Sequence, residues 1–501
     1  MSAALLVGVI AVPAAGSVLL AVTPARADRP ARWAAVGVSA ITLLLSALML
    51  SGRHGPRRGR VVDAWHQLDV PWVPALDIRF HLGVDGISWP LVTLTALLTL
   101  LCAIYSLRHV PPPGQARTML ALVLILEAGI LGVFLALDSL LFFVFFEVTL
   151  APMYALIAVW GGYGRRAAAR KFVLYTLFGS VLLLVGVVVV SVAGGTSDLV
   201  LLSARGGAGI ARTTQVAAFI LLLVAFAVKS PLWPLHTWLP DAHTEAPTIG
   251  SVLLAGVLLK MGTYGLIRIG LPVLPEGARA VAPWLGIFAV AAILVGGLVC
   301  LAMGELKRLI AYSSVGHMGF VLLGVATLTV PGLQAALFGN IAHGVITGLL
   351  FFLAGAVKDR YHTGQLDQLG GIATTAPELA GVLGFAAVAS LGLPGLAGFW
   401  GEAFAVVGSW LASPGGLFKT LAVLAALGAA LAAAYFLRLL RRTVVGPIGP
   451  AVSRDAPGLD TEERTAWAPL VILTLVLGLA PNLLLSLTVG PVRELVAVVG
   501  R

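Results

Sequence analysis

Two lysines, Lys229 and Lys260, lie inside stretches of sequence that are otherwise apolar. A charged side chain at the centre of a membrane-spanning helix costs about 2.5–3.5 kcal/mol, so each lysine needs a protein-lined interior or a function. Pro231 and Pro234 closely follow Lys229, and proline interrupts a helix because it lacks the N–H donor. Such a break is tolerated at membrane depth only where protein or water satisfies the freed carbonyl groups. These residues therefore predict an ion path through a membrane.

Glu147 is the acid best placed to act with these lysines, because it lies about nine residues into an apolar stretch and so close to mid-depth. In a Glu147–Lys229 pair, the charge of each partner would influence the protonation of the other, which is what a proton relay requires. A static structural ion pair is the alternative. Lys260 has no acidic neighbour on its own predicted helix, and an unpaired buried lysine favours the function of a proton carrier.

A second interruption, LGLPGLAGFWGE over 391–402, ends at Glu402. We interpret Glu402 as a further acid–base residue, with a helix-end acid facing water as the alternative. His317 and His343 fall within two more apolar stretches, and imidazole can pass protons near neutral pH, although a lone histidine in a helix often serves only packing.

Three further residues are secondary candidates for a proton path: Glu127, Asp241 and His243. Glu127 stands among small residues that suit close helix packing, where the carboxyl could simply bind a neighbouring backbone group. Asp241 and His243, together with Glu245, could form a cytoplasmic mouth for protons. For that segment we favour the other interpretation, a solvated loop capped by Thr244 and Thr248.

The composition requires a protein that crosses the membrane many times. The 501 residues are 59% hydrophobic and 11% charged, with a mean hydropathy of +1.01, whereas soluble domains carry about 25% charged residues. The formal charge of +10 comes from short basic runs between apolar segments, which fits membrane topology and argues against nucleic-acid binding.

No redox or nucleotide chemistry is predicted on this chain. Its two cysteines, Cys102 and Cys300, stand in apolar runs without a spacing suited to disulfides, zinc or iron–sulfur clusters. The sequence contains neither a G-x-x-x-x-G-K-[ST] loop nor a G-x-G-x-x-G fingerprint. Because uphill movement of one charge costs about 2.3 kcal/mol per 100 mV, a pump of this kind must take its energy from partner subunits or from exchange of ions.

The elements that must position these side chains are membrane helices. Fourteen apolar stretches of about 20 residues predict an all-α polytopic fold. They begin near Ala3, Ala31, Gly86, Arg117, Ser139, Arg170, Arg212, Thr248, Ala280, Lys307, Gly332, Pro377, Leu417 and Ala466. The first stretch resembles a signal peptide but lacks a basic start and is too long, so we expect a retained helix. The connection 51–85 should lie outside the bilayer, and its alternating end predicts a short hairpin.

The even helix count and the basic residues predict the orientation. Loops on one side hold eighteen Lys and Arg and those on the other twelve, so both termini are expected outside. The breaks in helices seven and twelve are five helices apart, which predicts two inverted repeats with a site at each break. The expected regions are 1–116 with helices one to three, 117–270 with the first repeat (helices four to eight), 280–440 with the second repeat (helices nine to thirteen), and 441–501 with a loop and helix fourteen.

Four long motifs resemble the antiporter-like membrane subunits of respiratory complex I, and most closely the M-type chains: HLGVDGIS, LFFVFFEVTLAPMY, AFAVKSPLWPLHTWLPDAHTEAPTIGSVLLAGVLLKMGTYGLIR and ELKRLIAYSSVGHMGF. The resemblance extends over nearly the whole chain and implies a polar axis along the membrane. By this resemblance, Glu147 and Lys229 are the first-half pair, Lys260 the central relay and Glu402 the terminal acid. L-type and N-type chains, and the D subunit of multisubunit cation/proton antiporters, typically carry lysine in the last position, so the acid favours the M type.

The resemblance implies a proton-translocating subunit of a NADH:quinone oxidoreductase, with NADH, FMN, iron–sulfur clusters and quinone on partner subunits and no cofactor on this chain. Expected neighbours are L-type and N-type antiporter-like chains and the lipid of a bacterial plasma membrane. The alternatives are a subunit of a multisubunit sodium/proton antiporter and a membrane scaffold without transport function.

Overall fold

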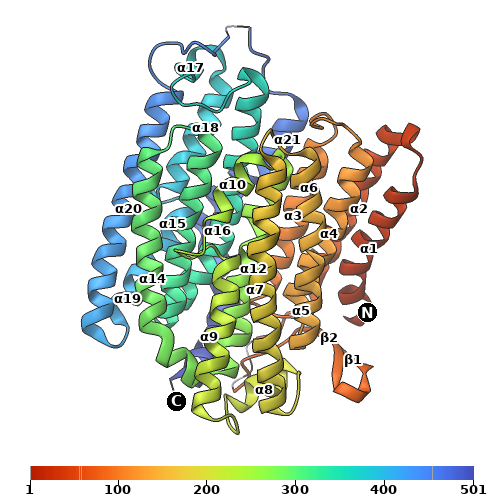
Figure 1. Cartoon of the computed structure of the whole chain (residues 1–501), viewed down its shortest axis with the longest axis vertical. Helices are drawn as coiled ribbons and strands as arrows, with labels where there is room; N and C mark the ends of the chain where they lie inside the picture. Colours follow the sequence, from red (N-terminus) through yellow and green to blue (C-terminus); the bar gives the residue numbers. More distant parts are fainter. Residues whose placement is uncertain (1, 56, 58, 454, 501) are drawn as a thin grey trace.

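The computed structural model describes residues 2–55, 57, 59–453 and 455–500, and shows a single bundle whose long helices run side by side (Figure 1). The first part of the bundle consists of α1 (Ser2–Val22), α2 (Asp28–Leu48), α3 (Trp89–Tyr105), α4 (Ala116–Leu135), α5 (Ser139–Val148), α6 (Leu150–Trp160), α7 (Arg165–Gly194) and α8 (Leu199–Arg205). Short 3₁₀ turns occur at η1 (Ala25–Ala27), η2 (Met49–Gly52) and η3 (Pro74–Leu76).

The central part holds α9 (Arg212–Lys229), α10 (Trp238–Glu245), α11 (Thr248–Leu253), α12 (Lys260–Gly265), α13 (Leu271–Val273), α14 (Pro275–Ala302), α15 (Leu306–Ala326) and α16 (Val330–Tyr361). Two π-helical turns, η4 (Leu254–Leu258) and η5 (Leu266–Gly270), lie between α11, α12 and α13. The last part comprises α17 (Ile372–Thr375), α18 (Pro377–Ser390), α19 (Ala397–Leu411), α20 (Gly415–Thr443), α21 (Thr461–Leu479) and α22 (Asn482–Val499).

The predicted all-α membrane architecture is confirmed. Among the described residues, twelve helical segments are long and apolar enough to cross a membrane, and two shorter apolar helices, α3 and α18, accompany them. Each of the fourteen predicted stretches begins within five residues of a helix start. The prediction of a single fourteenth helix is wrong, because this part of the chain forms two helices, α21 and α22, separated at Ala480 and Pro481.

The two most enclosed segments carry two of the polar residues of interest, Lys260 and His343. The span Thr248–Val273 and helix α16 are both fully buried by surrounding protein, whereas α1, α7 and α20 expose much of their apolar surface. Helix α16 contacts α15, α18, α19 and α21, so any charge on it is shielded from lipid by neighbouring helices. The bundle therefore supplies the protein-lined interior that intramembrane charges need.

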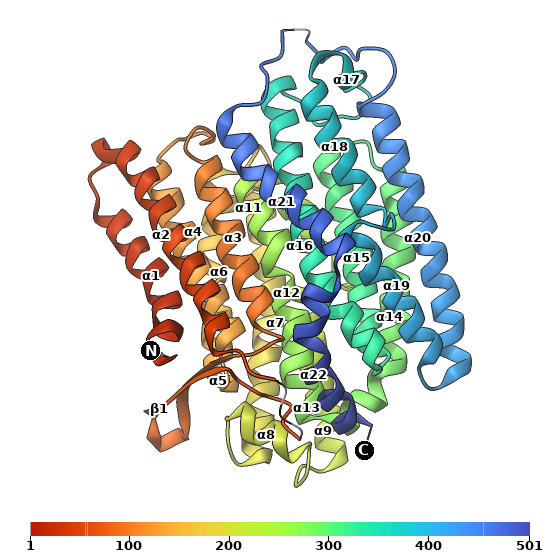
Figure 2. The ribbon, with the colours of Figure 1, turned by 180° about the vertical axis from the view of Figure 1, so that it is seen from behind.

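The connection 51–85 folds into the predicted hairpin. Strand β1 (His66–Val73) pairs antiparallel with β2 (Ile78–Val84), with His66 opposite Val84. Both chain termini lie toward the same end of the bundle as this hairpin (Figure 1, Figure 2), as an even number of crossings requires. The inverted relation of the two predicted repeats stays a prediction.

Candidate functional site

The first helix break lies where the prolines predict it. Helix α9 ends at Lys229, and the chain becomes helical again only at Trp238. The carbonyl of Val228 accepts a hydrogen bond from Nε1 of Trp238 at 2.9 Å, and Oγ of Ser230 donates to the carbonyl of Leu259 at 2.9 Å. Side chains thus satisfy backbone groups at the break and tie it to the helix that carries the second lysine.

Lys260 is fully buried at the first position of α12, directly after the π turn η4. Its Nζ donates a hydrogen bond to the carbonyl of Ala255, which belongs to that wide turn. The same Nζ lies 2.6 Å from Nδ1 of His343 on α16. π turns occur frequently at functional sites, and here the turn orients a carbonyl toward the lysine.

From His343 a line of polar side chains continues to the second break. The imidazole of His343 lies 5.9 Å, between ring centroids, from that of His317 on α15. Nδ1 of His317 is 3.1 Å from Oε1 of Glu402, and its Nε2 is 3.1 Å from Oγ of Ser390. Four sequence candidates from four helices, Lys260, His343, His317 and Glu402, therefore form one line, which we call the Lys260–Glu402 chain.

A small cavity of about 30 Å³ adjoins this chain and is lined by His317, His343 and Glu402 together with Ser390 and Thr347. Its mixed polar and apolar wall can accept water beside the two imidazoles. The arrangement can pass a proton, since each member can hold or release one and water can bridge the wider step between the rings.

Glycines of the second break make room for the terminal acid. Helix α18 ends at Ser390, and Gly392 and Gly395 then adopt positive φ angles of 83° and 92°. A Cβ atom on Gly392 would lie 2.8 Å from Oε2 of Glu402, which is too close for an ordinary contact. Glycine is therefore required there both for the backbone conformation and for the approach of the carboxylate.

The predicted Glu147–Lys229 pair is not a direct ion pair. In the described part of the chain no carboxylate oxygen lies within 4.0 Å of the Lys229 ammonium, which instead sits 4.7 Å from the ring centroid of Phe146. Oε1 of Glu147 has no hydrogen-bond partner among the described residues, and its charge acts on Lys229 only at longer range. A fixed salt bridge, the structural alternative, is absent from this part of the molecule.

Glu127 on α4 is 1% exposed, and neither of its carboxylate oxygens has a hydrogen-bond partner in the described residues. The expectation that this acid binds a neighbouring backbone group is therefore wrong. A buried carboxyl without partners is costly to ionise, and in the described part of the molecule no hydrogen bond or ion pair joins Glu127 to the Lys260–Glu402 chain.

The favoured interpretation of the segment after the first break, a solvated loop, is also wrong. Residues 238–245 form the helix α10, and the Thr244 hydroxyl donates to the carbonyl of Pro240 instead of capping a helix. Thr248 is the first residue of α11, and the N-cap position before it is held by Pro247, so Thr248 is not a cap. Helix α10 could not be recognised as a helix because Pro240 is its third residue and Pro247 follows it closely in sequence.

The two candidates on α10 point to different environments. Asp241 is half-buried and forms ion pairs with Lys171 at 2.7 Å and Arg308 at 3.4 Å. His243 is fully buried and stacks on Phe351 at 4.4 Å, with neither ring nitrogen hydrogen-bonded to a described residue. Asp241 is thus part of a surface ion network, while His243 belongs to the interior.

Residues 136–428 match the protein family described as NADH:quinone oxidoreductase/Mrp antiporter, TM. The matched segment is more than half of the chain and contains all members of the Lys260–Glu402 chain. The chain belongs to this family.

Similar family members include subunit M of the NADH-quinone oxidoreductase of Rhodobacter capsulatus, which is 40% identical over 500 residues, 96% of this chain and 93% of that one. Respiratory complex I from Thermus thermophilus contains a chain with a TM-score of 0.86 and 30% identity, with 99% of each chain covered. The Mrp complex from Dietzia sp. gives a TM-score of 0.84 at 25% identity, covering 98% of this chain but 52% of the other. The predicted resemblance to M-type antiporter-like subunits is confirmed, and the likeness to the Mrp complex is more distant.

One buried ion pair of this family member escaped the sequence analysis. Arg268, one of the twelve basic residues counted in the loops of the less basic side, lies inside the span Thr248–Val273 and pairs with Asp85 at 2.7 Å, with both side chains at most 3% exposed. Nε of Arg268 also donates to the hydroxyl of Tyr264 at 3.1 Å. The arginine within the apolar sequence GLIRIG was the available signal. Ser390, the second partner of His317, gave no signal because serine is common in helices.

Two groups of side chains are spaced closely enough to hold a metal ion: Asp69, His81 and Asp198, and His109, Asp460 and Glu463. In each group the protein itself occupies the ligand atoms. Nδ1 of His81 is 2.8 Å from Asp198, and both Glu463 oxygens accept hydrogen bonds from Arg360 at 2.6 and 2.7 Å. We therefore interpret both groups as structural.

The His81–Asp198 contact fixes the hairpin to the loop before α8, outside the membrane-spanning segments. Burial alone would raise the pKa of the Asp198 carboxyl, but the hydrogen bond and charge of His81 and the backbone N–H of Leu201 hold this pKa below its ordinary value. The charged form of Asp198 is consequently the one that stabilises the hairpin.

Proposed function

We propose that this chain moves protons across the membrane as the M-type antiporter-like subunit of a proton-pumping NADH:quinone oxidoreductase. The observation that carries the proposal is the Lys260–Glu402 chain, a line of protonatable side chains that starts in two fully enclosed segments, at Lys260 and His343, and continues to the largely buried His317 and Glu402. Quinone reduction on partner subunits supplies the energy, and this chain contributes side chains that hold and pass protons.

Within this proposal, Lys260 is the central station. Its ammonium has a neutral acceptor on either side, the carbonyl of Ala255 and the imidazole of His343, so it can give a proton to the ring without separating from a counter-ion. His317 then passes the proton to Glu402, whose carboxylate is held by the ring and by the glycine break. Lys229 and Glu147 form the first-half pair, in which the charge of Glu147 acts on Lys229 at longer range than a direct ion pair.

His243 is the proposed link between Lys260 and the end of the bundle opposite the termini. It lies close enough to Lys260, Lys307 and His343 for their charges to act on its ring. Its two ring nitrogens have no partner among the described residues, so water can bind either of them. Protons would enter at this cytoplasmic end, with both termini outside and with L-type and N-type chains as neighbours in the membrane.

The test uses three variants of the assembled enzyme: Lys260→Ala, Glu147→Gln and Glu402→Gln. We expect NADH-driven acidification of inverted membrane vesicles to fall at least about tenfold, because each variant removes a protonatable group from the path. Unchanged pumping by correctly assembled Lys260→Ala and Glu402→Gln enzymes would overturn the relay. The scaffold alternative requires that these variants affect assembly only.

The antiporter alternative is tested by purification. The proposal requires that the chain co-purifies with flavin and iron–sulfur subunits, whereas a sodium/proton antiporter subunit would purify without them and would support sodium-driven proton movement.

A further inference from the structure

A second cavity, of about 600 Å³, opens at the end of the bundle opposite the termini. Its walls come from the α3–α4 connection, the α6–α7 turn, the α10–α11 junction and the near ends of α15 and α16. We call it the end cavity. It is separate from the cavity beside His317 and Glu402, since the two share no lining residue.

Three cations line the end cavity without a carboxylate partner. In the described part of the chain, no acidic oxygen lies within 4.0 Å of the charged groups of Arg165, Lys307 or Lys358. Lys307 is 4% exposed, and among the described residues its ammonium donates only to the carbonyl of Ala246, at 3.0 Å. The charge of a buried ammonium that contacts a single carbonyl is poorly compensated. The positive charge of Lys358 also repels that of Lys307.

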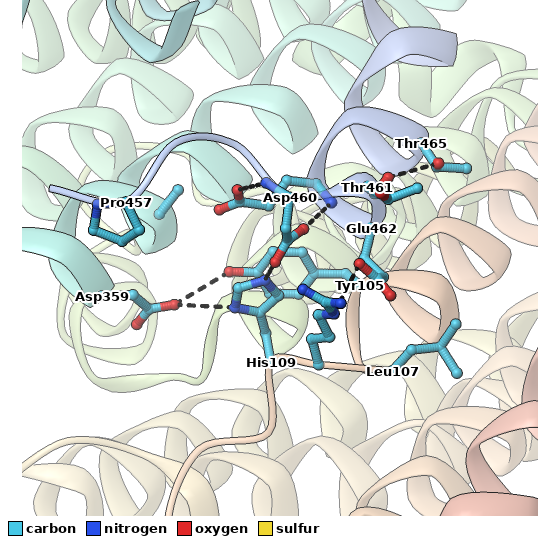
Figure 3. A network of polar contacts seen from close by, with 12 residues as sticks. Tyr105, Leu107, His109, Asp359, Pro457, Asp460, Thr461, Glu462 and Thr465 are labelled. Atoms are coloured by element: carbon cyan, nitrogen blue, oxygen red, sulfur yellow. Dashed lines mark hydrogen bonds and ion pairs between the residues drawn. The ribbon is translucent and has the colours of Figure 1, made fainter. Parts of the chain in front are cut away.

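The acids around this cavity act on Lys307 only at longer range, because each is engaged elsewhere. The Glu245 carboxylate accepts from the backbone N–H of Gly164 at 2.8 Å, and Glu305 accepts from the N–H of Arg308 at 2.5 Å. Asp359 accepts from the hydroxyl of Tyr105 at 3.3 Å and faces His109 (Figure 3). These acids therefore leave Lys307, Lys358 and Arg165 available to a ligand.

A fourth hydrogen-bond donor lines the end cavity beside the three cations. Thr248, whose hydroxyl makes no hydrogen bond in the structure to a described residue, also lines the cavity. Two ammonium groups, a guanidinium and a hydroxyl offer several N–H and O–H donors, and the two carboxylates in the cavity wall, Glu245 and Asp359, already accept hydrogen bonds from Gly164 and Tyr105. Such a donor set matches a tetrahedral oxyanion, and charge-assisted hydrogen bonds to phosphate are among the strong ones.

We propose that the end cavity binds a phosphate group, carried by an anionic phospholipid headgroup or by free phosphate. The bound phosphate compensates Lys307 and joins the ends of α15 and α16 to the start of α7. This site is distinct from the proton relay, because none of its three cations belongs to the Lys260–Glu402 chain.

The proposal is tested by phosphorus-31 NMR on the purified complex in detergent, at constant ionic strength and without turnover. The two probes are inorganic phosphate and a short-chain phosphatidylglycerol, each followed by broadening of its resonance. We expect one probe to bind and its affinity to fall about tenfold or more in Lys307→Gln and in Lys358→Gln, since each removes a charged hydrogen-bond donor. Arg166→Gln is the matched control, because Arg166 is exposed beside Arg165 but does not line the cavity.

Binding of inorganic phosphate identifies a soluble anion as the ligand, and binding of phosphatidylglycerol alone identifies a lipid headgroup; both outcomes support the site. The proposal is overturned if neither probe binds, which leaves a water-filled cavity only, or if Lys358→Gln binds as well as wild type. It is also overturned if Arg166→Gln weakens binding as much as the cavity variants do. Because Lys358 is exposed, that variant remains informative even if Lys307→Gln fails to assemble. None of these outcomes depends on proton pumping.

Discussion

Nζ of Lys260 and Nδ1 of His343 lie 2.6 Å apart inside two helices that protein surrounds completely. An ammonium group can only donate, so a charged Lys260 requires that Nδ1 of His343 carries no proton and accepts. The pair therefore holds a single proton between its two nitrogens. The protonation of Lys260 on α12 is therefore linked to that of His343 on α16.

Replacing His343 by alanine should stop transfer beyond Lys260, because the ammonium would retain only the carbonyl of Ala255 as a partner. We expect proton pumping in inverted vesicles to fall at least about tenfold at an unchanged amount of assembled complex. His362→Ala is the control, since His362 is an exposed residue that directly follows α16. Wild-type pumping by His343→Ala would remove this histidine from the path.

Asp85→Asn should destabilise the protein strongly. It leaves the Arg268 guanidinium, which is 2% exposed, without its charged partner, and loss of one partner of a buried ion pair costs about 3–5 kcal/mol. Thermal inactivation of the purified complex measures the effect. Asp69→Asn breaks the Asp69–Arg79 pair, whose side chains are 34% and 30% exposed, and should cost less than about 1 kcal/mol. Equal effects of the two variants would contradict the assignment of Asp85–Arg268 as a buried, stabilising ion pair.

The hairpin should lose stability in acid through Asp198. Because the pKa of this carboxyl is lowered in the folded protein, its contribution is fully present above its unfolded pKa of about 3.9 and is lost as the pH falls through the lower folded pKa. Hydrogen exchange of residues 66–84 at decreasing pH measures the loss. Asp198→Asn should be less protected at neutral pH and should show a flatter acid response. An identical pH profile in the variant would exclude Asp198 as the cause.

Gly262→Ala should disturb the contact between the first break and the lysine helix. A Cβ atom there would lie 2.3 Å from Oγ of Ser230 and 2.6 Å from the carbonyl oxygen of Phe226. We expect a loss of about 1–3 kcal/mol in stability, measured by thermal inactivation, together with reduced pumping. Gly381→Ala on α18 is the matched control, because a Cβ there meets no atom within 4 Å. Tolerance of Gly262→Ala would show that α9 and α12 can separate without consequence.

Much of the fold followed from hydropathy, because every membrane helix must satisfy its own backbone and bury apolar side chains in lipid or protein. The broken helices were predictable for the same reason, since Pro231, Pro234 and the glycines near Glu402 leave few alternatives at membrane depth. Helix α10 was missed because its eight residues include Pro240 and are too few to show a clear helical periodicity.

Within the candidate site, sequence identified the members of the Lys260–Glu402 chain but not their contacts. Lys260 and His343 are 83 residues apart, and only the packing of α12 on α16 brings them together. The Glu147–Lys229 ion pair was expected from the two charges and from the resemblance, yet the aromatic ring of Phe146 takes the place of a direct partner. Arg268 was misassigned because counting basic residues in loops does not recognise a buried ion pair with a distant acid.

The π turn before Lys260 makes the direction of this side chain depend on a residue count. A π turn holds one residue more than an α turn, so it rotates everything that follows by about 100° around the helix axis. Without the additional residue in Leu254–Leu258, an otherwise identical helix would present a different face to His343. The length of this segment is therefore fixed by the direction of the lysine, and an alignment gap at this point would identify relatives in which the lysine faces elsewhere.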